Sequence, residues 1–357
     1  MNKTKLWIAI SACFLVIVAM MTGIISNQAP DTQNITLTNV GFDTPVQFKA
    51  ECSAEEFEKY TTIVRESFTY YNSLFDKYHA YDGINNIYTL NQEAYDHAVE
   101  VDDELLECIE MSLDFNNPAF DITEGNVLNL WHTYREEGLT LNEEGKSGIL
   151  PEKEAIEQAL SHAGKDKIVI EGNTIRFTDP ELSLDLGGVA KGYACQKTAE
   201  KLKEAGLECG LINAGGNVVL IGEKKDSWHI GIQNPEAYEA IVTYATTSEC
   251  AIVTSGDYQR YYMVDDTMYS HIIDFSTGYP ANNMRSVTVI TNDSALADML
   301  STALFCMDVK DGQKWLEDKY PDVEAIWILD KNLEDASIEK DGYYIYTTDN
   351  VKEHIKS

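Results

Sequence analysis

The sequence predicts an α+β fold in which mainly antiparallel strands are flanked by helices. The chain has 357 residues, which is enough to bury a large core. The stretch "KIVIEGNTIRFTD" has the pattern of a hairpin that turns at Gly172-Asn173. Other strand patterns alternate with helical ones without internal repeats. Hairpins mixed with helices favour an α+β arrangement over a regular parallel βαβ sheet.

The first 26 residues differ from the rest and are expected to form a transmembrane anchor or a signal segment. An uncharged run extends from Leu6 to Ile25, long enough to cross a bilayer as one helix. Lys3 and Lys5 precede it and favour a cytoplasmic N-terminus, which would place the remaining chain on the extracytoplasmic side of the cell membrane. A cleaved signal peptide is the rival interpretation. Cys13 also gives a lipoprotein alternative, which we favour less because the apolar run continues after it.

A polar linker is expected over residues 27–39 and a single domain over residues 40–350. Its first helix begins near Ser53, which stands at capping-box spacing from Glu56. One face of that helix is apolar and comprises Phe57, Tyr60, Val64, Phe68, Tyr71 and Phe75.

Further elements follow in order along the chain. Pro151 is expected to start a helix that Gly164 ends. Another helix is expected from about Ser294 to Met307. Strands are predicted for "LINAGGNVVLIG", "CAIVTSG", "SVTVITN", "VEAIWILD" and "YYIYTT".

The charge balance is strongly acidic. The chain has 27 basic and 59 acidic residues, a formal net charge of −32. Such a surface repels nucleic acid, so an anionic ligand needs a local exception made of a metal ion, a basic side chain or backbone N–H groups. The cysteines after residue 26 form no CxxC pair, which indicates small buried residues rather than a disulfide framework or a metal site.

The stretch "SLDLGGVAKGYACQKTAEKL" combines an acid, glycines and a lysine at the start of a helix. Gly187 and Gly188 let a ligand approach the backbone closely, and a helix N-terminus favours negative charge. Lys191 adds a point charge suited to phosphate, whereas Asp185 suits a polar ligand edge or a metal. The spacing is neither a Walker A nor a dinucleotide motif, and taken alone it also fits a glycine turn followed by a solvated lysine.

Two later stretches contain further candidate catalytic and metal-binding residues. "HIIDFSTGYP" places His271 and Asp274 three residues apart before a turn. "ADMLSTA" places Asp298 and Thr302 on one helix face, an oxygen pair that suits a hard cation such as Mg²⁺ but equally a local hydrogen bond.

Together these motifs resemble the ApbE family of FAD:protein FMN transferases. "DLGGVAKGYA", "INAGGN", "TSGDYQRY", "HIIDFSTGYP" and "ADMLSTALF" occur in the family's order and spacing, and "GFDTPVQF", "FDKYHAYDGINNIYTLN" and "AFDITEGNVLNLW" match more loosely. The resemblance implies an ApbE-like, T-fold-like domain. It also implies a Mg²⁺-dependent enzyme that splits FAD and passes FMN through a phosphoester to a threonine or serine of an acceptor protein, releasing AMP.

The resemblance also implies roles for individual residues. Mg²⁺, or Mn²⁺, is expected between the Asp298 carboxylate, the Thr302 hydroxyl and the Gly188 carbonyl. His271 is expected to act as general base, with Asp274 orienting it or the water around the metal. The expected FAD contacts are Phe42, Tyr78, Ala119, Phe120, Asp121, Asp185, Lys191 and Ile273.

Four positions depart from the family pattern. Glu124 adds an acid near the expected FAD, Gln196 stands where aspartate is common, and Ser270 replaces one histidine of a frequent pair. Phe42 occupies the place of a family methionine.

Two alternatives remain open, and a third is excluded. Water in place of the acceptor would make the chain a FAD pyrophosphatase giving FMN and AMP, and loss of activity would make it a non-catalytic extracytoplasmic flavin-binding protein. The chain is not itself the acceptor, because family acceptors resemble Ser/Thr-Gly-Ala-Ser/Thr and it has no Gly-Ala dipeptide. The expected partner is another flavoprotein, such as a membrane redox-pump subunit or an extracellular flavin reductase.

Overall fold

The computed structural model describes residues 32–356. The expected anchor or signal segment at residues 1–26 lies outside this range. Within it, no helix combines the length and the apolar character that a membrane crossing requires. The segment expected to be a linker contributes a strand, because Thr32–Leu37 forms β1 and pairs with β2.

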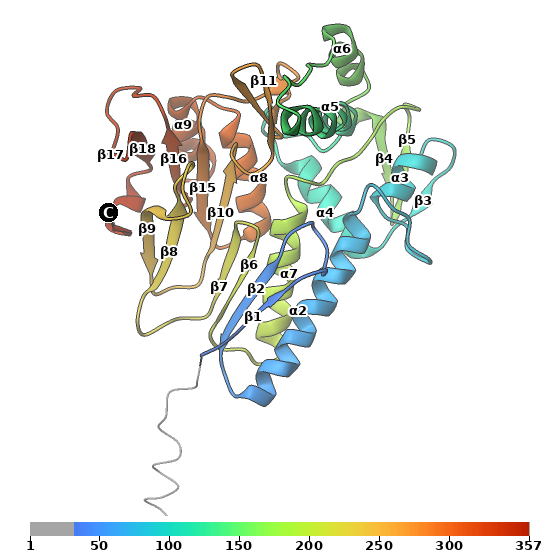
Figure 1. The fold of residues 1–357 in the computed structure, drawn as a ribbon. Helices are drawn as coiled ribbons and strands as arrows, with labels where there is room; N and C mark the ends of the chain where they lie inside the picture. Colours follow the sequence, from blue (N-terminus) through green and yellow to red (C-terminus); the bar gives the residue numbers. More distant parts are fainter. Residues whose placement is uncertain (1–31, 357) are drawn as a thin grey trace, which may run out of the picture.

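A nine-stranded sheet forms the centre of the fold, and all of its neighbouring strands pair antiparallel, as predicted (Figure 1). The prediction of a single strand for "LINAGGNVVLIG" is wrong, because this stretch forms a hairpin of two strands. Gly215 and Gly216 have φ angles of 58° and 97° and make its turn, because glycine adopts such angles without steric cost. In spatial order the strands are β1 (Thr32–Leu37), β2 (Val46–Glu51), β6 (Gly210–Ala214), β7 (Asn217–Ile221), β10 (Ala251–Gly256), β15 (Ser286–Thr291), β16 (Glu324–Leu329), β18 (Tyr343–Thr347) and β17 (Ile338–Lys340).

Three helices cover one face of this sheet: α2 (Ala54–Phe75), α7 (Ala190–Glu204) and α8 (Ser294–Phe305) (Figure 1). The expected capping box is confirmed, since the Ser53 and Glu56 side chains exchange hydrogen bonds with each other's backbone N–H groups. Gly192 of α7 lies against α8 so closely that a Cβ there would be 2.3 Å from the Ser294 carbonyl oxygen. This contact fixes how the two helices present their residues to the site.

A smaller sheet covers the other face. It contains β8 (Trp228–Gln233), β9 (Ala240–Thr246) and β19 (Ile355–Lys356), and its apolar residues pack against Leu220, Ile252 and Ile328 of the central sheet. Among the described strands β8 pairs only with β9, so it is an edge strand.

The remaining elements build the region beside the ends of the strands. A separate core of Val127, Trp131, Ile156, Tyr262 and Ile273 joins its helices to its hairpins. Its elements are α5 (Gly125–Glu143), α6 (Lys153–Ser161), β11 (Tyr261–Val264), β12 (Thr267–Ser270), β13 (Ile273–Asp274) and β14 (Tyr279–Pro280). Elsewhere lie α3 (Ile87–Glu93), β3 (Val99–Glu100), α4 (Asp103–Asp114), the predicted hairpin β4 (Ile168–Glu171) and β5 (Thr174–Phe177), and α9 (Val309–Lys319).

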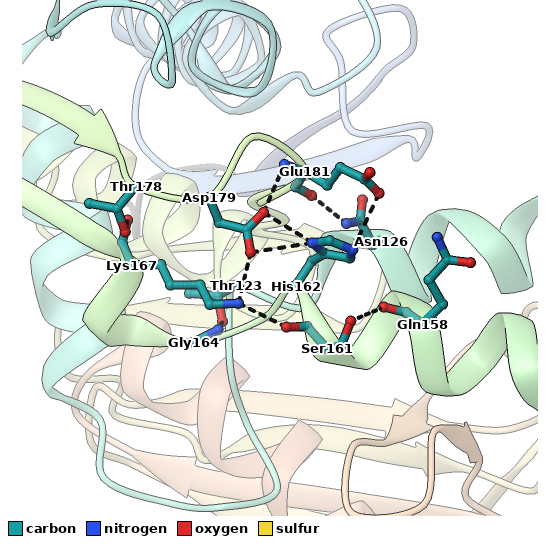
Figure 2. A network of polar contacts seen from close by, with 10 residues as sticks. All are labelled: Thr123, Asn126, Gln158, Ser161, His162, Gly164, Lys167, Thr178, Asp179 and Glu181. Carbon is teal, nitrogen blue, oxygen red and sulfur yellow. Dashed lines mark hydrogen bonds and ion pairs between the residues drawn. The ribbon is translucent and has the colours of Figure 1, made fainter.

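A polar network fastens the segment that leads into the site. Asp179 accepts from Lys167 at 2.9 Å and contacts His162 at 3.0 Å, while the Thr123 hydroxyl accepts from the Gly164 N–H (Figure 2). The Lys167 ammonium, the Glu181 N–H and His162 overcome the effect of burial and lower the pKa of Asp179 to about 2. The network therefore holds the Thr123 segment with a charged carboxylate at neutral pH.

Asp179→Asn is expected to lower the free energy of unfolding at pH 7 by about 1–3 kcal/mol, because charge-assisted hydrogen bonds are lost. The folded pKa lies below that of a free aspartate, about 3.9, so this stabilisation is present above pH ~4 and is lost as pH falls toward ~2. Urea denaturation at pH 7 and pH 2.5 measures the difference, with Asp349→Asn at an exposed ion pair as control. An equal destabilisation at both pH values would contradict this account.

Candidate active site

The glycine turn and the start of α7 meet α8 at one place. Gly188 faces Thr302, because a Cβ at Gly188 would be 3.4 Å from the Thr302 Oγ1. One helical turn earlier, the Asp298 Oδ2 accepts from the Gly192 N–H at 2.9 Å, and Asp298 is only 4% exposed. The three residues expected to bind metal are therefore brought together by the close packing of α7 on α8.

The donor set fits a hard cation. Burial raises the pKa of Asp298, while the Lys191 ammonium, the Gly192 N–H and the Asn217 amide favour its charged form. Asn217 is 1% exposed, and its Oδ1 has no hydrogen-bond partner within residues 32–356. A buried carboxylate, a hydroxyl and an unpartnered amide oxygen are the hard ligands that Mg²⁺ and Mn²⁺ accept. Asn217 was not among the expected site residues, although it ends the quoted "INAGGN".

Asp185 is held by a lysine that the sequence reasoning missed. The Lys77 Nζ lies 2.5 Å from the Asp185 Oδ2 and 2.6 Å from the Asn129 Oδ1. Burial lowers the pKa of Lys77, but the Asp185 carboxylate more than offsets this and the net shift is upward. The other Asp185 oxygen accepts from the Gly187 N–H at 2.7 Å, so this carboxylate shapes the glycine turn.

His271 lies among cations contributed by separate elements. Burial lowers its pKa to about 3, and Arg260, Lys191 and Arg135 reinforce the shift. In the unliganded protein His271 therefore differs from a free histidine, whose pKa is about 6.5. Its Nδ1 is buried and has no hydrogen-bond partner in the described part of the chain. The imidazole is neutral at pH 7 and able to accept a proton or a hydrogen bond.

Asp274 is not paired with His271. Its Oδ1 accepts from the Ser276 N–H at 2.9 Å and from the Ser276 hydroxyl at 2.7 Å, within its own turn. The carboxylate also acts on Glu124: burial, together with Asp121 and Asp274, raises the pKa of Glu124 to about 8. The expectation that Glu124 adds a negative charge is corrected, because most of it is protonated at pH 7.

Glu124→Gln is expected to change how stability depends on pH. The raised folded pKa means that the wild-type protein loses stability as pH rises from about 4, the pKa of a free glutamate, to about 8. The glutamine variant has no such loss. Urea denaturation at pH 5 and pH 8 should show a gain for the variant that is larger at pH 8, with the exposed Glu55→Gln as control. Parallel pH profiles for the variant and the wild-type protein would contradict the assignment.

Of the expected flavin-contacting side chains, Tyr78 alone is open to solvent, at 51% exposure. Phe42 packs edge-on against Phe68, and Phe120 packs on Phe115. Ala119, Phe120 and Ile273 offer mainly backbone to a ligand, since they are 8%, 4% and 2% exposed.

A cavity of about 970 Å³ opens beside these residues, at the upper end of the range for small-molecule sites. Tyr78, His132, Arg135 and Arg260 line it. Its two arginines also act on His271, but three carboxylates, those of Asp43, Glu136 and Glu143, line the cavity as well. The two arginines are local cations for an anionic ligand of a protein with net charge −32, although the lining as a whole is not basic.

The fold is α+β, and the candidate site places hard oxygen ligands close to basic side chains. The family model described as the ApbE family matches residues 42–327. The chain is 31% identical over 251 residues to the FAD:protein FMN transferase of Klebsiella pneumoniae (strain 342), covering 68% of this chain and 75% of the relative. The Treponema pallidum (strain Nichols) protein of the same name is 27% identical over 262 residues, 67% of this chain and 69% of the relative.

Solved structures of ApbE proteins also resemble this chain. The ApbE protein from Thermotoga maritima has a TM-score of 0.74 at 29% identity and covers 91% of this chain and 100% of its own. A mutant of the flavin transferase ApbE from Vibrio cholerae has a TM-score of 0.73 at 25% identity, with 90% and 99% covered. The chain belongs to the ApbE family and, with these relatives, is classed as a transferase.

Proposed function

We propose that this chain transfers FMN from FAD to a serine or threonine hydroxyl of an acceptor protein, forming a phosphoester and releasing AMP. The relatives' shared name supports the activity. The observation that carries the proposal here is the convergence of Asp298, Thr302 and Gly188 next to Lys191. The hydroxyl and the lysine suit the pyrophosphate of FAD, and the buried carboxylate suits a cation that would accompany it.

The residues of the chain have separate tasks in this proposal. Asp298, Thr302 and the Gly188 carbonyl hold Mg²⁺ or Mn²⁺, which stabilises charge on the pyrophosphate oxygens when bound. Lys191 pairs with a phosphate, and Lys77 keeps Asp185 and its turn in place for the dinucleotide.

The transfer step conserves its atoms and charges. The acceptor oxygen bonds to the FMN phosphorus, the phosphorus–oxygen bond to AMP breaks, and His271 takes the hydroxyl proton. The negative charges of bound FAD offset Lys191, Arg135 and Arg260, which raises the pKa of His271 from the low value of the unliganded protein. We propose that Asp274 either orients water bound to the metal or holds the turn that follows His271.

The acceptor is proposed to carry a Ser/Thr-Gly-Ala-Ser/Thr motif. We also propose that the segment before residue 27 anchors the chain in the cell membrane with the enzyme on the extracytoplasmic side. The acceptor then lies on the same side, as a redox-pump subunit or an extracellular flavin reductase would.

Mass spectrometry of the acceptor tests the proposal. The full chain, FAD, Mg²⁺ and an acceptor fragment are incubated together, and the fragment is expected to gain one FMN at a serine or threonine of the Ser/Thr-Gly-Ala-Ser/Thr motif. An unmodified fragment with FMN and AMP in solution would instead identify a pyrophosphatase. Bound FAD without products would identify a flavin-binding protein.

A further inference from the structure

Asn217 lies at the start of β7, on the face of the central sheet that the helices cover. Along β7, Val219 and Ile221 belong to the core beneath the helices. Val218 and Leu220 instead pack against the smaller sheet, and Val218 lines a second cavity of about 300 Å³ on that side. Side chains two residues apart in a strand share a face, so Asn217 points with Val219 toward α7 and α8.

Helix α7 connects Asn217 to the candidate metal ligand Asp298. The Cys195 Sγ lies 3.8 Å from the Asn217 carbonyl oxygen, and three residues earlier the Gly192 N–H donates to Asp298 at 2.9 Å. Residues three apart lie on the same side of a helix, so one side of α7 contacts both Asn217 and Asp298. The Asn217 amide also donates to the Asp298 carboxylate and thereby favours its charged form.

This hydrogen bond determines which atom of the Asn217 amide is left without a partner. An ionised carboxylate accepts hydrogen bonds and cannot donate them, so the Nδ2 of Asn217 serves Asp298 and the Oδ1 does not. Asn217 is 1% exposed, and its Oδ1 has no hydrogen-bond partner among residues 32–356. A buried acceptor without a donor destabilises a protein, and native proteins keep few of them outside sites that bind a water or an ion.

A divalent cation at Asp298 suits this oxygen. Mg²⁺ prefers octahedral coordination by oxygen, and amide carbonyl oxygens are among the ligands that hard cations accept. The three expected ligands, Asp298, Thr302 and the Gly188 carbonyl, would fill half of such a shell. The Asn217 Oδ1 belongs to an amide already bonded to Asp298, so it lies in the immediate surroundings of the carboxylate expected to bind the ion.

We propose that the Asn217 Oδ1 is a further ligand of the divalent cation at Asp298, while the Asn217 Nδ2 holds the carboxylate. This inference rests on the proposed function, because it adds a residue to the cation site of that reaction. The backbone that carries the ligand is held on both sides, since Asn217 pairs with Ala214 of β6 and with Val253 of β10.

Asn217→Ala removes the oxygen and tests whether it binds the ion. Titration of the full chain with Mn²⁺, followed by electron paramagnetic resonance with and without FAD, measures affinity independently of turnover. The variant is expected to bind Mn²⁺ at least about tenfold more weakly than the wild-type chain, because the ligand set determines the affinity of such sites. Asn234→Ala is the matched control and should leave the affinity unchanged. Asn234 is also buried, at 6% exposure, but its Oδ1 already accepts from the Glu236 N–H at 3.0 Å.

Asn217→Cys separates a ligand from a residue that only positions Asp298, and it is the deciding variant if Asn217→Ala does not fold. A thiolate prefers soft cations such as Cd²⁺ over Mn²⁺. If residue 217 binds the ion, the variant is expected to bind Cd²⁺ more tightly than the wild-type chain and to gain an ultraviolet sulfur-to-cadmium charge-transfer band. The wild-type chain supplies the background, since its own Cys195 lies beside Asn217.

Three results would overturn the proposal: a cysteine variant without the band, a folded alanine variant with wild-type Mn²⁺ affinity, or no Mn²⁺ binding by the wild-type chain with or without FAD. The expected metal-binding results in a chain that attaches no FMN would support the Asn217 ligand and refute the proposed function. FMN attachment by the wild-type chain, with no band in the cysteine variant, would refute the ligand alone.

Discussion

Asp298→Asn is expected to abolish FMN transfer, by at least about a thousandfold, if the buried carboxylate holds the catalytic metal. The variant keeps an oxygen that can accept from the Gly192 N–H but loses the negative charge. Burial already raises the pKa of Asp298, so removing the charge should not lower the melting temperature of the metal-free protein. Transfer rate, Mg²⁺ affinity by calorimetry and melting temperature are measured together.

Asp293→Asn is the matched control, because Asp293 caps the same helix and asparagine caps equally well. It should retain both activity and metal affinity. An Asp298→Asn variant that still binds Mg²⁺ and transfers FMN at the wild-type rate would remove the metal assignment.

His271→Ala is expected to lower the transfer rate about 10²–10⁴-fold, the usual contribution of a general base. FAD binding should persist, because the imidazole is neutral in the unliganded protein and supplies no charge to the phosphates. Single-turnover transfer and FAD titration separate the two effects.

His97→Ala serves as control, since His97 is exposed and lines neither cavity. A His271→Ala variant whose FAD affinity collapses would show that the histidine has a structural role. An unchanged rate would mean that another group accepts the proton.

Local signals predicted several elements correctly. The capping box set the start of α2 at Ser53, and the Gly172-Asn173 turn set the β4–β5 hairpin, because both depend on neighbouring residues. The strand β1 was missed because its alternating polar residues resemble a linker until β2 pairs with it. Likewise, the glycines of the β6–β7 turn stand inside a long apolar run that reads as one strand.

The candidate site depends even more on contacts between residues far apart in the sequence, which local signals do not predict. The family resemblance identified Asp298, Thr302 and Gly188 as a group, and the structure brings them together. Lys77 was not foreseen as the partner of Asp185, since the two lie 108 residues apart. The low pKa of His271 could not be predicted either, because it comes first from burial and then from Arg260 and other cations of separate elements.

The most direct test of the central claim is the ratio of AMP released to flavin attached covalently to the acceptor. The full chain is mixed with FAD and acceptor fragment, with Mg²⁺ or with EDTA, and in-gel flavin fluorescence is compared with AMP measured by chromatography. The account predicts one AMP for each attached flavin and neither product in EDTA. AMP release without attached flavin, or attachment that persists in EDTA, would contradict it.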